Sequence, residues 1–547
     1  MTLRMERVPT KQAGAGRAIE NYEQLRQRFR WKIPEYFNIG AEVCEPNGQR
    51  SNNVALIVDA GGKTTRLSFE DLRRMSNRFA NVLVGDGLMR GERVAVFLPA
   101  LSESPIAHLG SFKAGFVSVP ISSQLAAEGL QYRLFNSAAR AIVTDSEGAA
   151  KLNIIRHELP ELEHVYVVGS GTAHGSEAPL ARAMARASDD FKSVRTRADE
   201  MATMIFTSGT EGQPKGVLHA HRVLLACLPG FELIHDLPVA GELFWTPADW
   251  SWIAGVLPAL AAWRFGMPVL MNQTARFNPE DAVRLMAQHE VRHAGLGPTA
   301  LKLMRLTNVR IPPVRVRTIA SGGEAVSPEI LEWVQSRFGI VLHEGYGQTE
   351  CVPTIGNSGL CPVRPGSMGR AIVGHEVRII DELGEELAPG ETGFIGVRKP
   401  DPGLFLSYWN DPRSTEAKVA GDFFLTGDLA SQDDQGYFWH LGRTDDIIKS
   451  AGHRIGPGEI EQCITSHGAV SMAAVVGVPD KTTGESVKAW IVLKPDRKPS
   501  QELATEIQEF VRARLAPHQR PRQVAFVDNL PINDNGKVIR RELRTRG

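Results

Sequence analysis

Short, nearly continuous apolar runs constrain the fold of this chain more than any other feature. Four of them, 93–98, 141–144, 165–168 and 204–206, have the length and composition of buried strands. Helical patterns separate these runs along the chain. Strands that are apolar on both faces need helices above and below them, which is the arrangement of parallel sheets. The runs therefore predict an α/β fold, with parallel or mixed sheets covered by helices.

The clearest helical pattern follows Ser68. Ser68 is suited to cap a helix, and Asp71 stands at the third helical position, which forms an imperfect capping box. Apolar residues then recur on one helical face, at Leu72, Met75, Phe79 and Leu83. We expect this face to pack on one of the predicted sheets.

The pattern of predicted helices and strands changes near Gly442. The later part predicts two helices and three strands, in the order helix 457–466, strands 472–478 and 487–493, helix 502–515 and strand 523–527. This is a small α+β unit of a size that can fold by itself. We therefore predict a large N-terminal domain over 1–444 and a small C-terminal domain over 445–547.

The length, the charge balance and the distribution of apolar residues argue against several classes of protein. With 547 residues, the chain is too long for one hydrophobic core. Lysine plus arginine equals aspartate plus glutamate at 62 each, so the basic excess of a nucleic-acid binder is missing. Residues 1–16 lack the apolar stretch of a secretory signal. The most apolar segment, 256–271, is interrupted by Arg264 and two prolines, which predicts buried core and no membrane span.

The five cysteines are scattered and form no CxxC pair. This pattern argues against a disulfide framework or a cysteine-based zinc site, and it predicts a reduced cytoplasmic protein.

A Gly- and hydroxyl-rich loop carries the strongest chemical signal. It runs over 207–216 directly after the strand 204–206, and its candidate phosphate-binding residues are Thr207, Ser208, Gly209, Thr210 and Lys215. Glycines allow the backbone to approach a ligand closely, and hydroxyls, N–H groups and a lysine suit phosphate oxygens. A Walker A loop is excluded, because Gly216 follows Lys215 where that motif needs Ser or Thr. The alternative is an exposed turn.

Five further segments follow in order: Ser321 to Ala325, Tyr346 to Glu350, Leu425 to Asp428, Gly442 to Lys449, and Pro531 to Leu543, which contains Asn535, Gly536 and Lys537. Together with 207–216 they resemble the motifs of the adenylate-forming superfamily, which includes acyl-CoA synthetases, peptide-synthetase adenylation domains and firefly luciferase. Each segment alone is a weak signal, but six in the same order across most of the chain are specific. The resemblance implies a large adenylate-forming domain and a small mobile C-terminal domain.

The implied activity has two steps, namely formation of an acyl-adenylate from ATP and a carboxylic acid, and transfer of the acyl group to coenzyme A. The transition state of the first step places negative charge on phosphate oxygens. By resemblance, Lys537 bridges the carboxylate and phosphate oxygens, Thr349 donates its hydroxyl to the α-phosphate, and Glu350 binds Mg²⁺, which prefers oxygen ligands. For each, the alternative is a surface residue with no such role, and Asn-Gly-Lys alone most often forms a hairpin turn.

The resemblance also assigns the remaining nucleotide contacts. Asp428 accepts hydrogen bonds from the ribose hydroxyls, and Arg443 contacts the same sugar; the alternative is a surface ion pair. Tyr346 flanks the adenine or is a core aromatic. The other residues placed around the nucleotide are Gly323, Glu324, Ala325, Glu344, Gly345, Gly347, Gln348, Arg454 and Lys537.

Asp445 occupies the hinge position of the family. The resemblance implies that the small domain rotates about it after pyrophosphate leaves. Gly452, His453 and Arg454 then help to admit coenzyme A, although Ala451 stands where the family often has serine. The alternative for Asp445 is an acid in an exposed loop.

The acyl pocket is assigned to Trp250, Gly255 and Gly347. Acetate-activating relatives carry tryptophan where this chain has Gly347, so we expect a pocket larger than acetate needs. Residues 344–350 and 364–369 look most like the medium-chain acyl-CoA synthetase branch, which implies a medium-chain fatty or aromatic acid. Trp250 is nearly as well explained as a buried core residue.

Three other functions are alternatives to a coenzyme A ligase. An acyl-AMP ligase that loads a carrier protein shares all six motifs, although no carrier domain follows Gly547. A catalytically idle nucleotide-binding protein has no need for this complete set of residues. A P-loop NTPase disagrees with the Lys215–Gly216 order. The expected partners are ATP, the acid and coenzyme A, with no nucleic acid and no membrane span, and a homodimer is left open.

Overall fold

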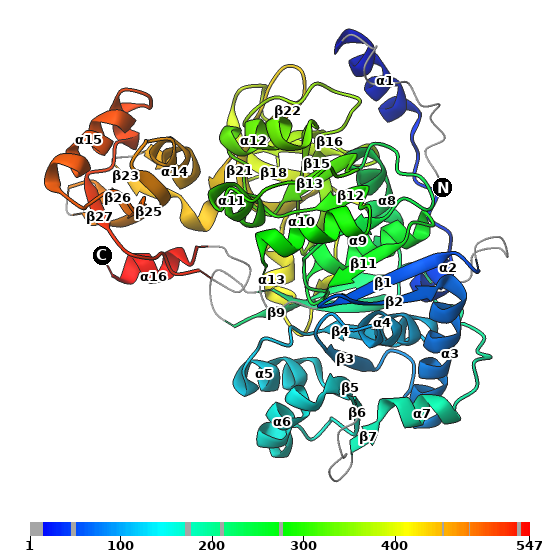
Figure 1. The fold of residues 1–547 in the computed structure, drawn as a ribbon. Helices are drawn as coiled ribbons and strands as arrows, with labels where there is room; N and C mark the ends of the chain where they lie inside the picture. The colour runs from blue at the N-terminus through cyan, green and yellow to red at the C-terminus, as the bar shows by residue number, and fades with distance from the viewer. Residues whose placement is uncertain are drawn as a thin grey trace. The chain divides into compact units, whose positions relative to one another are not determined.

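The computed structural model describes residues 15–44, 51–169, 177–207, 213–272, 277–450, 453–480, 482–532 and 538–546, except the side chains of 15–21, 177, 445, 449, 453 and 454. The chain divides into two compact units (Figure 1). Unit 1 comprises Met1–Glu376 and Pro400–Ala417, and unit 2 comprises Val377–Lys399 and Lys418–Gly547.

The first sheet of unit 1 has eight strands in the order β19-β9-β8-β4-β3-β5-β6-β7. Their bounds are β3 Arg93–Phe97, β4 Val117–Pro120, β5 Ala139–Asp145, β6 His164–Val168, β7 Glu177–Pro179, β8 Met201–Thr207, β9 Lys215–Ala220 and β19 Ser407–Tyr408. The strands from β3 to β8 run parallel, whereas β9 is antiparallel to β8 and β19 is antiparallel to β9.

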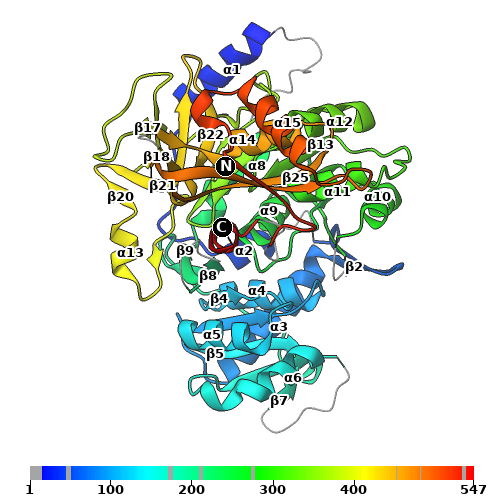
Figure 2. The ribbon, with the colours of Figure 1, turned by 90° about the vertical axis from the view of Figure 1, so that its left-hand side faces the viewer.

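Helices cover both faces of this sheet, as the continuous apolar runs predict. The helices are α3 Phe69–Gly85, α4 Glu103–Lys113, α5 Ala127–Ser137, α6 Ser146–Ile155 with the 3-10 turn Arg156–Glu158, and α7 Leu180–Arg186. Along β3, Val94 and Val96 join the core formed with α3 and α4, while Ala95 and Phe97 join the core formed with α5 and α6. Figure 2 shows these four helices beside the strands of the sheet. Successive side chains of a strand point to opposite faces, so an unbroken apolar run buries both.

The second group of strands in unit 1 follows the order β16-β15-β14-β13-β12-β10-β11-β1-β2. Their bounds are β1 Val54–Ala60, β2 Lys63–Ser68, β10 Phe244–Trp245, β11 Val269–Asn272, β12 His293–Gly295, β13 Thr318–Gly322, β14 Leu342–Gln348, β15 Cys351–Gly356 and β16 Gly369–Ala371. The strands from β1 through β14 in this order are parallel, and β2, β15 and β16 are antiparallel additions.

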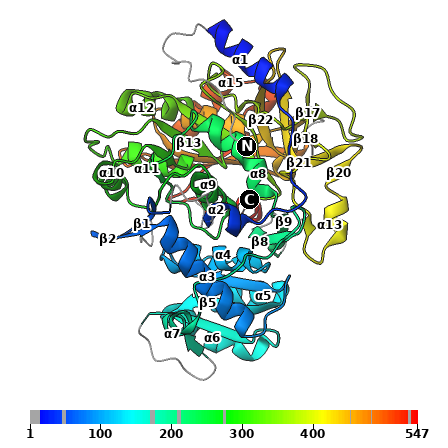
Figure 3. The ribbon, with the colours of Figure 1, turned by 90° about the vertical axis from the view of Figure 1, so that its right-hand side faces the viewer.

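Helices cover this second group as well (Figure 3). One core contains α8 Val223–Ile234 and α9 Ile253–Arg264, together with α2 Ile39–Cys44 and residues of α3, α4 and both sheets. The other contains α10 Pro279–Gln288, α11 Pro298–Leu306 and α12 Pro328–Phe338. Unit 1 also includes α1 Ala15–Arg28 and α13 Pro412–Glu416.

Unit 2 begins with antiparallel strands and ends with the small α+β portion. The first strands follow the order β17-β18-β21-β22, with β20 beside β21, and the second follow β24-β23-β26-β25, with β27 beside β26. The strands are β17 Val377–Ile380, β18 Thr392–Arg398, β20 Val419–Ala420, β21 Phe423–Gln432, β22 Tyr437–Arg443, β23 Ile448–Ser450, β24 His453–Ile455, β25 Val470–Asp480, β26 Gly484–Leu493 and β27 Gln523–Phe526. The helices are α14 Pro457–Thr465, α15 Gln501–Arg512 and α16 Arg540–Thr545, with the 3-10 turns Thr444–Asp446 and Pro517–Gln519.

The predicted elements are present, with shifted ends. Ser68 caps α3, and the capping box with Asp71 is complete: the Asp71 N–H donates to Ser68 Oγ at 3.1 Å and the Ser68 N–H donates to Asp71 Oδ2 at 2.8 Å. The helix predicted over 502–515 ends at Arg512, before Pro517, which disfavours helical geometry just ahead of it. The domain boundary at 444/445 stays a prediction.

The segment 256–271 contributes to α9 and β11, and most of its residues are buried, as predicted. Within the described residues, no helix is long and apolar enough to cross a membrane. All five cysteines are free thiols.

Candidate active site

The candidate phosphate loop joins two antiparallel strands. Thr207 ends β8, Lys215 begins β9, and the two residues are direct partners across the hairpin. Because a strand and not a helix follows the loop, it differs from the strand–loop–helix of a P-loop NTPase, as the sequence predicts. The Tyr132 hydroxyl donates to the Pro214 carbonyl at 2.9 Å. Ser208, Gly209 and Thr210 lie outside the described residues.

Lys215 contacts the segment that contains α13. Its Nζ lies 3.4 Å from Asp411 Oδ2, hydrogen bonds to Ser414 Oγ and lies 5.1 Å from the centroid of the Tyr408 ring. Asp411 also caps α13, because its carboxylate accepts from the Ser414 N–H at 3.0 Å. The Lys215 side chain is 37% exposed, so its ammonium group is accessible to an anionic ligand.

Thr349 and Glu350 form the turn between β14 and β15. The Thr349 carbonyl accepts from His219 Nε2 at 2.5 Å. Burial lowers the pKa of His219 to about 4, so this imidazole is neutral at physiological pH, with its proton on Nε2. The Glu350 carboxylate accepts from the Tyr408 hydroxyl at 2.5 Å, and the Glu350 carbonyl accepts from the Phe405 N–H at 2.8 Å.

The turn after β13 is held by Glu344 of β14. Gly323 has φ +86°, a conformation that favours glycine, and Gly322 lies so close to Gly345 that a Cβ on Gly322 would be 2.3 Å from the Gly345 carbonyl oxygen. The Val326 N–H donates to Glu344 Oε2 at 3.2 Å. Burial raises the pKa of Glu344 to about 7, and the Val326 hydrogen bond opposes this effect. Glu324 and Ala325 lie in this turn.

Tyr346, Gly347 and Gln348 end β14 at a register irregularity and are partly buried. A Cβ on Gly347 would lie 2.8 Å from both the Cα and the N of Pro353. The absence of a side chain therefore allows β14 and β15 to approach each other here. Gly255 is similar, because its Cβ would lie 2.2 Å from the Asp249 carbonyl oxygen.

Trp250 is 7% exposed and packs between two rings. Its ring centroid lies 5.6 Å from that of Trp263 and 5.8 Å from that of His108. Both Trp250 and Gly255 thus have packing reasons to be present, and their role as pocket walls remains a prediction.

In unit 2, Asp428 of β21 is the direct partner of Arg443 of β22. Arg443 Nη1 lies 3.6 Å from Asp428 Oδ1, and His440 Nε2 lies 3.3 Å from the same oxygen. Asp428 is buried, so the structure holds together a fixed carboxylate and a guanidinium, which is the pair expected to contact the ribose.

The remaining predicted residues are described only in part. Asp445 lies in the turn Thr444–Asp446, and His453 and Arg454 lie on β24, but their side chains are not described. Gly452 and Lys537 lie outside the described residues. The roles assigned to these five residues stay predictions.

Asp446, next to the expected hinge, is tied to the C-terminal helix of the same unit. Its carboxylate contacts Arg540 at 3.2 Å and Arg544 at 2.9 Å, both from α16, and Arg540 also pairs with Glu461 of α14 at 2.8 Å.

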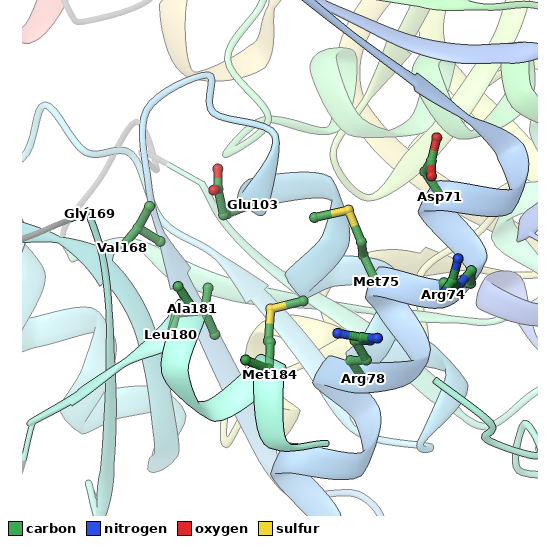
Figure 4. A pocket seen from close by; sticks show the side chains of 11 residues that line it. Asp71, Arg74, Met75, Arg78, Glu103, Val168, Gly169, Leu180, Ala181 and Met184 are labelled. Carbon is green, nitrogen blue, oxygen red and sulfur yellow. The ribbon is translucent and has the colours of Figure 1, made fainter. Parts of the chain in front are cut away.

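A pocket of about 310 Å³ lies elsewhere in unit 1, between α3 and α7 (Figure 4). None of the predicted site residues lines it. Its two arginines, Arg74 and Arg78, already contact Asp189 at 2.7 and 3.6 Å, and its Asp71 completes the cap of α3. We therefore do not assign the reaction to this pocket.

The residues fit a magnesium ion that is held mainly by phosphates. Within the described part of the chain, no cluster of three or more His, Cys, Asp or Glu side chains could form a site made of protein ligands alone. Mg²⁺ commonly keeps several waters and binds one or two carboxylates plus substrate phosphates. Glu350 is partly exposed, and its hydrogen bond to Tyr408 uses Oε1, which leaves Oε2 for a cation.

Several residues of this site were not predicted from the sequence: His219, Tyr408, Asp411, Ser414 and His440. Each contacts a predicted residue only through folding, and none stands in a recognisable motif. In the sequence, Tyr408, Asp411 and Ser414 have the pattern of an ordinary loop followed by a short helix.

Two family models match this chain. The model described as AMP-binding enzyme covers residues 45–409, and the AMP-binding enzyme C-terminal domain covers residues 459–537. The mitochondrial acyl-coenzyme A synthetase ACSM3 of Rattus norvegicus is 35% identical over 544 residues, covering 96% of this chain and 93% of the relative.

Solved structures of other proteins resemble this chain over nearly its whole length. The anthranilate CoA ligase AuaEII in complex with anthranoyl-AMP superposes with a TM-score of 0.85 at 26% identity, covering 94% of this chain and 98% of that one. A benzoate CoA ligase from Burkholderia xenovorans LB400 superposes with a TM-score of 0.81 at 27% identity, covering 93% of this chain and 100% of that one.

One sequence prediction is wrong. We expected a cytoplasmic protein, whereas the relative that matches along nearly the whole chain is named as a mitochondrial enzyme. A set of scattered cysteines does not distinguish one reducing compartment from another.

Proposed function

This chain belongs to the AMP-binding enzyme family, and we propose that it is an AMP-forming acid–CoA ligase whose acid is a medium-chain fatty acid or an aromatic acid. Its substrates are ATP, the carboxylic acid and coenzyme A, and it uses Mg²⁺.

The reaction has two balanced steps. A carboxylate oxygen of the acid attacks the α-phosphorus of ATP, the bond to the β-phosphate oxygen breaks, and acyl-AMP and pyrophosphate form. The coenzyme A thiol then attacks the acyl carbon, the thiol proton is released, and acyl-CoA and AMP leave. The first step turns a poor electrophile into one with a good leaving group.

Each charged or polar residue of the site is assigned to a different group of the substrates or to Mg²⁺. Lys215 presents a cation to the phosphates from the start of β9, and Thr349 offers its hydroxyl to the α-phosphate. Glu350 would hold Mg²⁺, which supplies charge neutralisation at the phosphate oxygens. Lys537 is assigned to the carboxylate and phosphate oxygens during adenylation.

Asp428 and Arg443 are assigned to the ribose, Asp445 to the hinge, and Gly452, His453 and Arg454 to the entry of coenzyme A. The β13 turn with Gly323, Glu324 and Ala325 is assigned to the adenine, together with Tyr346.

One observation carries the proposal within unit 1. Lys215 and the Thr349–Glu350 turn are more than a hundred positions apart in the sequence, and the same region of the fold contacts both. His219 contacts the Thr349 carbonyl, and Tyr408 contacts both Lys215 and Glu350. Tyr408 thus links Lys215, which is assigned to the phosphates, with Glu350, which is assigned to Mg²⁺.

Two arguments favour an acid larger than acetate. The residue at 347 is glycine where acetate-activating relatives carry tryptophan. Two ligases that superpose on nearly the whole chain are named for anthranilate and benzoate, which are aromatic acids. The expected role is in fatty acid or aromatic acid metabolism.

The test is to incubate the purified protein with ATP, Mg²⁺, coenzyme A and acids from acetate to decanoate plus benzoate, and to measure AMP and acyl-CoA. We expect both products, formed fastest with medium-chain or aromatic acids. AMP without thioester would instead indicate an acyl-AMP ligase, and AMP formation from acetate alone would refute the proposed acid class.

We include self-association into a homodimer in the proposal, and light scattering of the purified protein tests it.

A further inference from the structure

We propose that residues 401–414, the supporting segment, position Glu350 and Lys215 for the adenylation step, and that Tyr408 is the positioning residue that links the two. This inference rests on the proposed function, because it assigns a role in the magnesium- and ATP-dependent half of that reaction. All of the contacts that carry it lie within unit 1.

The first part of the supporting segment runs along the Thr349–Glu350 turn as a short antiparallel partner. The Val352 N–H donates to the Gly403 carbonyl at 3.2 Å, and the Phe405 N–H donates to the Glu350 carbonyl at 2.8 Å. Cys351 and Leu404 form the bridge between these two bonds. The backbone from the Glu350 carbonyl to the Val352 N–H is therefore paired with this segment.

A buried contact between His375 and Asp401 anchors the start of the segment. His375 Nδ1 lies 2.8 Å from Asp401 Oδ2, and the two side chains are 0% and 3% exposed. The other Asp401 oxygen accepts from the Gly403 N–H at 2.7 Å. A buried carboxylate satisfied on both oxygens fixes the turn that presents Gly403 to β15.

Tyr408 anchors the far end. It is 5% exposed, and its ring packs edge-on against Phe405 with centroids 4.9 Å apart. On its backbone side it pairs with Val217 in β9, two residues after Lys215. Its hydroxyl donates to Glu350 Oε1 at 2.5 Å, and the Lys215 ammonium lies 5.1 Å from its ring centroid.

The physical effect of this contact is pre-organisation. A glutamate on a turn has several rotamers, and ordering one of them on metal binding costs free energy. A hydrogen bond from a phenol to a carboxylate is charge-assisted and short, so it favours one rotamer before the cation arrives. It also uses one carboxylate oxygen and leaves the other for Mg²⁺, which fits monodentate binding.

Lys215 is held from the same segment. Asp411 and Ser414 contact its Nζ, and both lie at the start of α13, a few residues after Tyr408. These contacts orient a long side chain that is otherwise free to adopt many conformations, and the pair with Asp411 is only partly buried, so phosphate oxygens can compete for the ammonium.

The test compares Tyr408→Phe with a matched control, Tyr166→Phe. Both changes keep the ring and remove a phenol–carboxylate hydrogen bond from a buried tyrosine; in the control, the Tyr166 hydroxyl donates to Asp86 at 2.6 Å, in the core around α3 and β6. ATP binding is measured by calorimetry with and without Mg²⁺, in the absence of acid and coenzyme A. The Mg²⁺ dependence of AMP formation, the rate of thioester formation from supplied acyl-adenylate, and Tm are measured in parallel.

We expect Tyr408→Phe to weaken Mg²⁺-dependent ATP binding and to raise the Mg²⁺ concentration needed for adenylation by about tenfold, as is typical for loss of a group that orients a metal ligand. ATP binding without Mg²⁺ and thioester formation from acyl-adenylate should stay near wild type. Tyr166→Phe should lower Tm without moving the Mg²⁺ dependence.

An unchanged Mg²⁺ dependence in Tyr408→Phe would overturn the positioning role, as would an equal shift in both variants or an equal loss in both half-reactions. If the wild-type protein neither binds ATP nor forms AMP with any acid, the proposed function fails and this role fails with it. If the wild type reacts and only the Tyr408 result is negative, the inference alone fails.

Discussion

The buried carboxyl group of Glu344 makes a quantitative prediction about stability and pH. Its pKa is raised by burial from 4.5 to about 7, against the opposing hydrogen bond from the Val326 N–H. Below pH 4.5 the group is protonated in both the folded and the unfolded chain. Between pH 4.5 and 7 the unfolded chain releases the proton while the folded chain retains it, so the folded state loses stability as the pH rises through this window. Above pH 7 the loss is complete and constant.

The size of the effect follows from the two pKa values. At roughly 1.4 kcal/mol per pH unit, the interval from 4.5 to about 7 corresponds to about 3 kcal/mol of unfolding free energy. Glu344→Gln removes the ionisation and keeps an oxygen to accept from Val326. Unit 1 has about 400 residues, and at roughly 2 cal/mol/K of unfolding entropy per residue the change corresponds to about 4 °C in Tm if the unit unfolds cooperatively.

The assay is scanning calorimetry of wild type and Glu344→Gln at pH 5, 6, 7 and 8. We expect the Tm difference to be small at pH 5, to grow in favour of the variant as the pH rises to about 7, and to stay nearly constant at pH 8. Glu332→Gln, on the exposed surface of α12, controls for the loss of one acidic charge. Parallel Tm–pH curves for wild type and Glu344→Gln, or a variant that is less stable at pH 8, would refute the reasoning.

Three further substitutions test the site and the fold. Lys537→Ala should abolish acyl-adenylate formation and spare thioester formation from supplied acyl-adenylate; a comparable loss in both half-reactions, measured separately, would contradict its role. Gly347→Trp should shift the acid preference towards acetate and also lower Tm, because a Cβ at this position meets the Pro353 backbone at 2.8 Å; a folded variant with the wild-type chain-length profile would show that position 347 does not line the acyl pocket. Ser68→Ala removes the cap of α3 and should reduce the unfolding free energy by about 1 kcal/mol without changing kcat; an unchanged Tm would mean that the capping box contributes nothing measurable.

The sequence by itself determined the local elements and the order of the motifs. The α3 helix was predictable because its cap and its apolar face are set by residues three and four positions apart, within reach of a single helical turn. The strands of the first sheet were predictable because burial on both faces requires an unbroken apolar run. The six motifs were recognisable because each is contiguous, and their order identified the family that the comparisons confirm.

Only the tertiary structure decided which side chains meet. Tyr408 reaches Glu350 across 58 positions, His219 reaches Thr349 across 130, and Lys215 reaches Ser414 across 199. Periodicity carries no information about such pairs, because they depend on which strands the sheet places next to each other. The same holds for glycines: Gly347 stands out in the sequence as a missing pocket wall, but only folding brings the Pro353 backbone so close that a side chain at position 347 would have to displace β15. The raised pKa of Glu344 likewise arises from burial of its carboxyl group, and only the fold produces that burial.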